Sequence, residues 1–203
     1  MESITGLIEK FGTDLKENKK KHGMQLGDFV SLPMNTVKAL PEDIEQTEAK
    51  LSIRIPDELR NYYLNEANGN KVNVTDHQLI DGGLDIFSHQ KIFGVYDYFD
   101  FYWSVLYEGY GIELMNEQLS DSEMEFVLEK NKEFFVCAAD WSDNFIETFV
   151  FDKEGNFYRF YFDQDLHILE YIQDMLSNHH SINKSHSFSK LLSEYLDKIK
   201  GDS

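Results

Sequence analysis

The chain has 203 residues, 41% of them hydrophobic and 14% aromatic, which suits one domain with a substantial core and excludes a disordered chain. Its formal net charge is −18, and residues 71–165 contribute −14 of this through 20 acidic and six basic side chains. A negative field of this size repels phosphate backbones and anionic lipids, so we expect no binding to nucleic acid or to membranes.

The N-terminal segment predicts an amphipathic helix. Apolar residues recur at spacings of three and four from Ile4 to Leu15, and Ser3 is placed to cap the helix. Three lysines at residues 19–21 suit its C-terminus, and Gly23 follows them. The first residues lack the basic and apolar regions of a secretory signal, so we expect a cytoplasmic protein.

Two helices that begin at prolines are predicted next. Pro41 and Pro56 are each followed by two acidic residues, and both features favour the first turn of a helix. Gly69 follows the second helix, where a positive φ angle is commonly required. The predicted buried face of the second helix consists of Leu59, Tyr62, Tyr63 and Ala67.

After residue 70 the hydrophobic period changes from that of a helix toward two, which indicates strands. We expect short strands at residues 71–74, 84–87 and 91–95, with a turn at residues 81–83. Residues 96–132 are aromatic and irregular, apart from a predicted helix at residues 120–130. The side chains expected to face inward from that helix are Met124, Val127 and Leu128.

The clearest strand signal is the apolar run at residues 134–139, which predicts a central strand. It contains Cys137, the only cysteine, which we expect to be buried in a protein of a reducing compartment. A hairpin is predicted at residues 145–162, with Gly155 in its turn. Helices at residues 166–176 and 188–199 complete the chain.

The order of helices, strands and helices indicates an α+β fold. We expect a single domain with a twisted, mainly antiparallel sheet flanked by N- and C-terminal helices. Residues 1–35 would form an N-terminal helix and connector, and residues 36–203 the main domain.

No motif for catalysis or metal binding is found. The glycines near residues 82 and 110 lack the spacing of a phosphate-binding loop, and one cysteine excludes a thiolate zinc cluster. The histidines at residues 179, 180 and 186 lie in a polar segment and are expected to be solvent-exposed. Asp140 and Asp143 could form an acid–base pair only if their surroundings separated their pKa values. We therefore expect no catalytic residue, no cofactor and no metal, and a hydrolase is the third hypothesis for function.

A series of weak motifs, taken in order, resembles the SUKH superfamily. The segments that carry the resemblance are residues 40–48, 53–64, 68–69, 135–140, 145–151, 155–162 and 187–192. Many bacterial members of this superfamily resemble immunity proteins that bind and block toxin domains, and fungal relatives regulate cell-wall synthesis through protein contacts. The resemblance implies a non-enzymatic immunity protein that neutralises a cognate bacterial toxin. The alternative is an intracellular regulatory or scaffold protein of the same fold with an endogenous partner.

The charge favours a basic toxin, for example a nuclease, because an enzyme that acts on a polyanion needs a basic surface. Aromatic side chains near the acids are candidate anchors, with core packing as the alternative role of Trp103. The candidate partner-binding residues are Asp97, Asp100, Asp140, Trp141, Asp143 and Glu147, with Tyr102 and Trp103 as further anchors.

Overall fold

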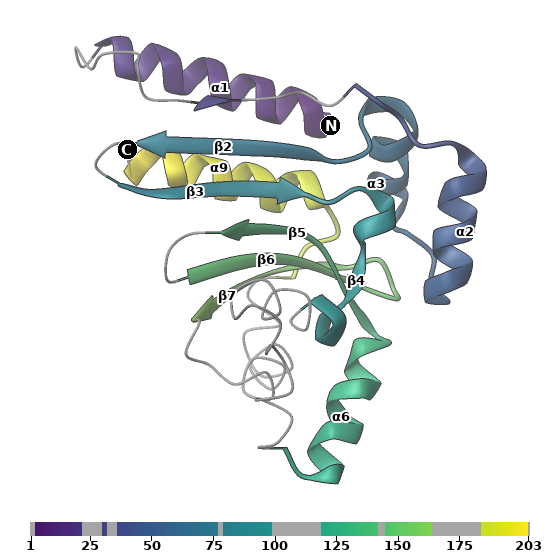
Figure 1. Cartoon of the computed structure of the whole chain (residues 1–203). Coiled ribbons are helices and arrows are strands. Elements are labelled where there is room, and N and C mark those ends of the chain that lie inside the picture. Colours follow the sequence, from purple (N-terminus) through teal and green to yellow (C-terminus); the bar gives the residue numbers. More distant parts are fainter. Residues whose placement is uncertain are drawn as a thin grey trace.

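The computed structural model describes residues 3–21, 30–31, 36–76, 79–98, 119–141, 145–163 and 184–202. Its centre is a seven-stranded sheet with the order β1-β2-β3-β5-β6-β7, in which β4 also pairs with β5 (Figure 1). All pairings between the described strands are antiparallel. The chain is thus a single α+β domain with an antiparallel sheet, as the sequence predicts.

Three consecutive strands form the part of the sheet that the sequence predicts most clearly. They are β5 (Phe134–Trp141), β6 (Phe145–Asp152) and β7 (Phe157–Asp163). Gly155 has a φ angle of 81° in the connection between β6 and β7, which confirms its predicted role in the turn. Strand β5 lies in the middle of the sheet because β6 pairs with one edge and β3 and β4 pair with the other.

The remaining strands are β1 (Val30–Ser31), β2 (Asn70–Asp76), β3 (Leu79–Ile86) and β4 (Phe93–Gly94). The predicted turn at residues 81–83 is wrong, because these residues lie inside β3 and Gly83 pairs with Asn73 of β2. Backbone pairing holds glycines in a strand even though they contribute no side-chain packing. The predicted strand at 91–95 is reduced to β4, between the 3₁₀ turn η2 (His89–Lys91) and a helical turn at residues 95–98.

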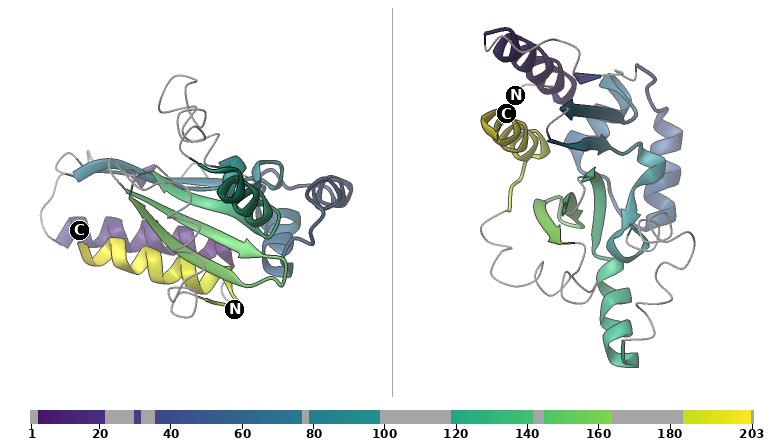
Figure 2. Two further views of the ribbon diagram at one scale, coloured as in Figure 1. Left: turned by 90° about the horizontal axis from the view of Figure 1, so that it is seen from below. Right: turned by 60° about the vertical axis from the view of Figure 1, so that its left-hand side comes forward.

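Helices α1 (Ile4–Lys21) and α9 (Phe188–Asp202) lie side by side on one face of the sheet (Figure 2). The hydroxyl oxygen of Ser3 accepts a 3.0 Å hydrogen bond from the backbone N–H of Gly6, which confirms the predicted cap of α1. Nine apolar residues of the two helices join the larger hydrophobic core. Its members on α1 and α9 are Ile4, Leu7, Ile8, Phe11, Phe188, Leu191, Leu192, Tyr195 and Leu196.

Helices α2 (Pro41–Leu51) and α3 (Asp57–Asn61) lie at one end of the sheet, and α3 continues as the π-helical turn η1 (Tyr62–Glu66). All four residues that the sequence places on the buried face of the second helix are buried. Glu58 of α3 caps α9, because its carboxylate accepts the backbone N–H groups of Phe188 at 2.7 Å and Ser189 at 2.8 Å. The bond to Phe188 joins two segments that lie 130 residues apart in the sequence.

Helix α6 (Asp121–Asn131) lies on the side of the sheet opposite α1 and α9, and it extends away from the strands (Figures 1 and 2). Val127 packs into the second hydrophobic core, as predicted, whereas Leu128 is 40% exposed and the prediction that it faces inward is wrong. Val127 and Leu128 differ by about 100° around the helix axis, so only one of the two side chains can point directly at the sheet.

Several predicted features lie outside the described residues: the helix at 166–176, Tyr102, Trp103, His179 and His180. None of the helices in the described part of the chain has the length and apolar character needed to cross a bilayer.

Candidate partner-binding surface

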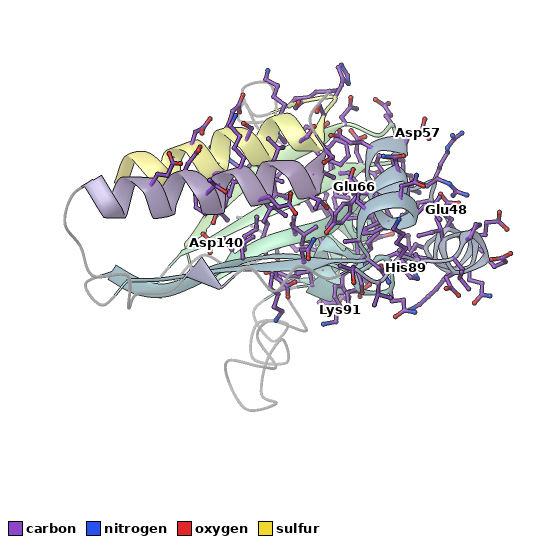
Figure 3. All side chains as sticks on the ribbon, turned by 90° about the horizontal axis from the view of Figure 1, so that it is seen from above. Glu48, Asp57, Glu66, His89, Lys91 and Asp140 are labelled. Atoms are coloured by element: carbon purple, nitrogen blue, oxygen red, sulfur yellow. The ribbon has the colours of Figure 1, made fainter. Side chains whose placement is uncertain are left out.

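Two of the predicted contact residues, Asp140 and Glu147, lie directly opposite each other on β5 and β6. A β-bulge between Val136 and Ala138 changes the alternation of β5, so that Cys137 and Ala138 both join the core beneath α9. Asp140 therefore faces α9, where its carboxylate accepts a 2.6 Å hydrogen bond from the hydroxyl of Tyr195. Figure 3 shows that Asp140 lies well away from the end of the sheet that carries Glu48 and His89.

Glu147 is only 8% exposed and has its own cationic partners. Its carboxylate lies 2.7 Å from Nε of Arg159 on β7 and 3.9 Å from Nζ of Lys198 on α9. Burial raises the pKa of Glu147, and the nearby Arg159 and Lys198 oppose that rise. The partner-binding role of Asp140 and Glu147 remains a prediction. The side chain of Glu147 is buried and exposes little area to a partner.

Asp97 is exposed and is held beside the C-terminus of α6. Asn131 of α6 donates a 3.2 Å hydrogen bond from Nδ2 to the Asp97 carboxylate. Its Oδ1 accepts the backbone N–H groups of Tyr96 at 2.9 Å and Asp97 at 3.2 Å. A Cβ atom at Gly94 would overlap the side chain of Asn131, so this glycine is needed for the close approach of β4 and α6.

The structure thus separates the predicted contact residues into two places. Asp140 and Glu147 lie together under α9, whereas Asp97 lies on the opposite side beside α6. Trp141 ends β5, where its backbone pairs with Ile146. Asp100 and Asp143 lie outside the described residues.

Helix α6 presents an acidic stripe that our sequence analysis missed. Asp121, Glu125, Leu128 and Glu129 are all exposed. Their spacing of four, seven and eight residues places them on one side of the helix, and we call these four residues the α6 stripe. Within the part of the chain that the structure describes, the three acids of the stripe form no ion pair. The spacing of the acids was the signal that could have identified it.

The start of α6 is fixed by a capping box. The carboxylate of Glu123 accepts the backbone N–H of Ser120 at 2.8 Å and its hydroxyl at 2.6 Å. Lys130, in the last turn, pairs with Glu133 at 2.7 Å and lies 5.7 Å from the centre of the Phe126 ring. The capping box therefore fixes the N-terminal turn from which the exposed acids of α6 extend.

Among the described residues, no three histidine, cysteine or acidic side chains lie close enough together to hold a metal ion. Cys137 is fully buried, and its thiol donates a 3.3 Å hydrogen bond to the backbone oxygen of Phe149. Burial raises the pKa of this thiol, which disfavours the nucleophilic thiolate. The buried position that the sequence predicts for Cys137 is confirmed.

Comparison with known proteins identifies one family. The model of the SMI1 / KNR4 family (SUKH-1) matches residues 38–193, which run from the segment before α2 into α9 and leave α1 outside the match. No curated protein and no solved structure matches the chain.

Proposed function

The chain belongs to the SMI1 / KNR4 family (SUKH-1), and on that premise we propose that it is an immunity protein that neutralises a cognate toxin through the α6 stripe. Membership of this family fits either an immunity role or a regulatory role. Both roles act through protein contacts, and both need a surface that recognises another protein.

The observation that carries the proposal is the charge on α6. Residues 119–133 contain five acidic and two basic residues, and Asp97 adds a further carboxylate beside Asn131. In the described part of the chain, α6 stands away from the sheet (Figure 1), and Asp121, Glu125 and Glu129 are exposed on it. Residues 119–133 therefore carry a net charge of −3, and the exposed acids of the α6 stripe are available to a partner.

A basic toxin domain is the partner that suits this surface. A toxin that cleaves nucleic acid must carry lysines and arginines at its substrate site, and the α6 stripe would pair with them. Complementary charge accelerates association. Leu128, which lies among the acids of the stripe, supplies an apolar side chain that is removed from water when the partner binds. A protein bound at that site would block access of the nucleic acid.

The test is co-expression with the toxin domain encoded in the neighbouring gene. We expect the full chain to form a 1:1 complex and to restore growth. The double variant Glu125→Lys/Glu129→Lys should weaken the complex by about 100-fold or more, because two attractive contacts become repulsive. The matched control is Glu9→Lys/Glu17→Lys, which reverses two exposed acids on α1 and should leave affinity and growth unchanged.

Two results would contradict the proposal. One is protection by the α6 variant equal to that of the wild type. The other is a chain that binds no toxin and instead forms a stoichiometric complex with an endogenous protein, which would establish the regulatory alternative.

A further inference from the structure

His89 begins the turn η2 at the end of the sheet that also carries Glu48 of α2 (Figure 3). The residue is 1% exposed, and its Nδ1 lies 2.8 Å from Oδ1 of Asn68. That amide oxygen also accepts the backbone N–H of His89 at 3.0 Å. Because an amide oxygen can only accept, Nδ1 is the ring nitrogen that carries the proton. Asn68 therefore holds η2 through two hydrogen bonds to one residue.

The other ring nitrogen of His89 is enclosed by the protein. Nε2 is buried and forms no hydrogen bond with the described residues. In the neutral ring it is an acceptor without a donor, whereas protonation would place a charged N–H there without an acceptor. A buried charged donor without a partner costs more free energy than a buried neutral acceptor without one. The closed site therefore favours the neutral ring.

The titratable groups around His89 do not reverse this preference. Burial is the larger effect and lowers the pKa of His89, whereas the nearby Asp43 of α2 acts to raise it. Lys50 of α2 lines the same cavity as His89 and Asp43, and Lys91 is exposed on η2 itself. Tyr63 of η1 meets the imidazole edge-on with ring centres 6.1 Å apart, and burial raises the pKa of Tyr63 well above its usual value. Its hydroxyl therefore carries no charge that could stabilise an imidazolium.

The turn η2 lies between two fixed points of the sheet. Before it, the backbone N–H of Phe87 donates to the Cys137 oxygen at 2.9 Å. After it, Phe93 of β4 pairs with Val136 of β5. A cavity of about 190 Å³ lies between η2 and α2. Residues 88–92 therefore form a short segment that can open locally while both of its ends stay in the sheet.

We propose that His89 is a pH-sensitive latch, which holds η2 against Asn68 at neutral pH and releases the turn when the ring is protonated. The latch goes beyond the proposed function, because it requires no toxin. In the open turn the ring reaches water and titrates near its ordinary pKa of about 6.5, whereas its pKa is lower in the closed turn. The open form therefore binds protons more readily. The ratio of open to closed turn rises up to about tenfold for each pH unit below about 6.5, and becomes constant below the pKa of the closed form.

Amide hydrogen exchange of the full isolated chain from pH 7.5 to 4.5 tests the latch. Protection factors are compared, because they remove the intrinsic pH dependence of exchange. The reporters are the N–H groups of His89, which donates to Asn68, and Lys91, which donates to the Ser88 oxygen at 2.9 Å. Their protection should fall by about tenfold as the pH falls. The N–H of Phe87 is the internal control and should keep its protection, because it stays in the sheet.

Nitrogen NMR of the histidine rings measures the titration directly and needs no variant. We expect His89 to carry its proton on Nδ1 at pH 7.5 and to titrate at a lower pH than the exposed His186. Titration of His89 at the same pH as His186, or at a higher pH, would overturn the proposal. Protection of the η2 amides that did not change with pH would overturn it equally.

Asn68→Asp should abolish the release, because a carboxylate at this position still accepts both N–H groups and favours the charged ring. Protection of η2 should then stay constant or increase as the pH falls. His186→Gln is the matched control, since it removes an exposed histidine and should leave the release unchanged. An equal acid-induced loss of protection in Asn68→Asp and the wild type would show that His89 is not the latch.

Discussion

The hydroxyl of Tyr195 on α9 donates a 2.6 Å hydrogen bond to the carboxylate of Asp140 at the end of β5. Tyr195 is 3% exposed, and its ring contacts Phe149 edge-to-face with ring centres 5.5 Å apart. Burial, followed by the nearby Asp140, raises the pKa of Tyr195 well above its usual value, so the hydroxyl remains a donor. This bond joins the C-terminal helix to the centre of the sheet.

Tyr195→Phe should destabilise the fold by about 2 kcal/mol, because it removes a hydrogen bond to a charged group and leaves the ring packing in place. Urea unfolding of Tyr195→Phe, Asp140→Ala and the double variant would measure the coupling between the two side chains. We expect a coupling free energy of about 1.5 kcal/mol. Additive effects of the two substitutions would show that the bond contributes nothing.

Arg159→Met should destabilise the fold by about 3 kcal/mol at pH 8, because it leaves Glu147 buried with only Lys198 at 3.9 Å. Burial raises the folded pKa of Glu147 above 4.5, so its contribution to stability is largest below pH 4.5 and is lost as the pH rises through the folded pKa. Removing Arg159 raises that pKa further. The difference from the wild type should therefore be smaller at pH 5 than at pH 8.

Urea unfolding at the two pH values checks this prediction. Adding Glu147→Gln to Arg159→Met should recover much of the lost stability at pH 8, since it removes the unpaired charge. Arg54→Met is the control, because Arg54 and its partner Asp57 are both highly exposed and their pair should contribute little at either pH. A pH-independent effect of Arg159→Met would contradict the prediction.

Asp152→Asn should destabilise the hairpin of β6 and β7 by about 2 kcal/mol at pH 7. The carboxylate accepts hydrogen bonds from the backbone N–H groups of Glu154 and Asn156, both at 2.9 Å, and from the hydroxyl of Tyr158 at 2.7 Å. Burial acts to raise the pKa of Asp152, but these bonds and the Asn156 amide lower it overall. Its stabilisation is therefore present above about pH 3.8 and is lost as the pH falls through the lower, folded pKa.

Chemical unfolding of Asp152→Asn and the wild type from pH 2 to 7 checks the predicted direction of this pH dependence. The free energies of unfolding of the two proteins should converge as the pH falls. Glu125→Gln, an exposed acid on α6, should follow the wild type throughout. A difference that stayed constant with pH would rule out the carboxylate bonds as its cause.

Gly94→Ala should destabilise the fold by about 2 kcal/mol and loosen α6, because the new methyl group would displace Asn131. Hydrogen exchange should become faster at the N–H groups of Tyr96 and Asp97, which lose their acceptor. Gly155→Ala is the control: it strains a positive φ angle in another turn, with Pro56 Cβ 4.0 Å away, and should leave these two amides protected. Unchanged exchange in Gly94→Ala would contradict the role of this contact.

The helices and strands with strong local patterns could be predicted from the sequence. Local signals mark the residues from Ile4 to Leu15, the prolines at 41 and 56, and the apolar run at residues 134–139. They are readable because capping, helix periodicity and burial act over a few neighbouring residues. Predictions from weaker sequence patterns were wrong where pairing with another strand set the backbone conformation. Gly82 and Gly83 resemble a turn, yet β2 pairs with them and holds them in a strand.

The sequence by itself determined the fold class, the central strand and the concentration of negative charge in the middle of the chain. Only the tertiary structure decided where the acids lie. A bulge after Val136 turns Asp140 toward Tyr195, and Glu147 is matched by Arg159 from the next strand. The physical reason is that strand register and the packing of distant elements set these positions, and neither leaves a periodic signal in the local sequence.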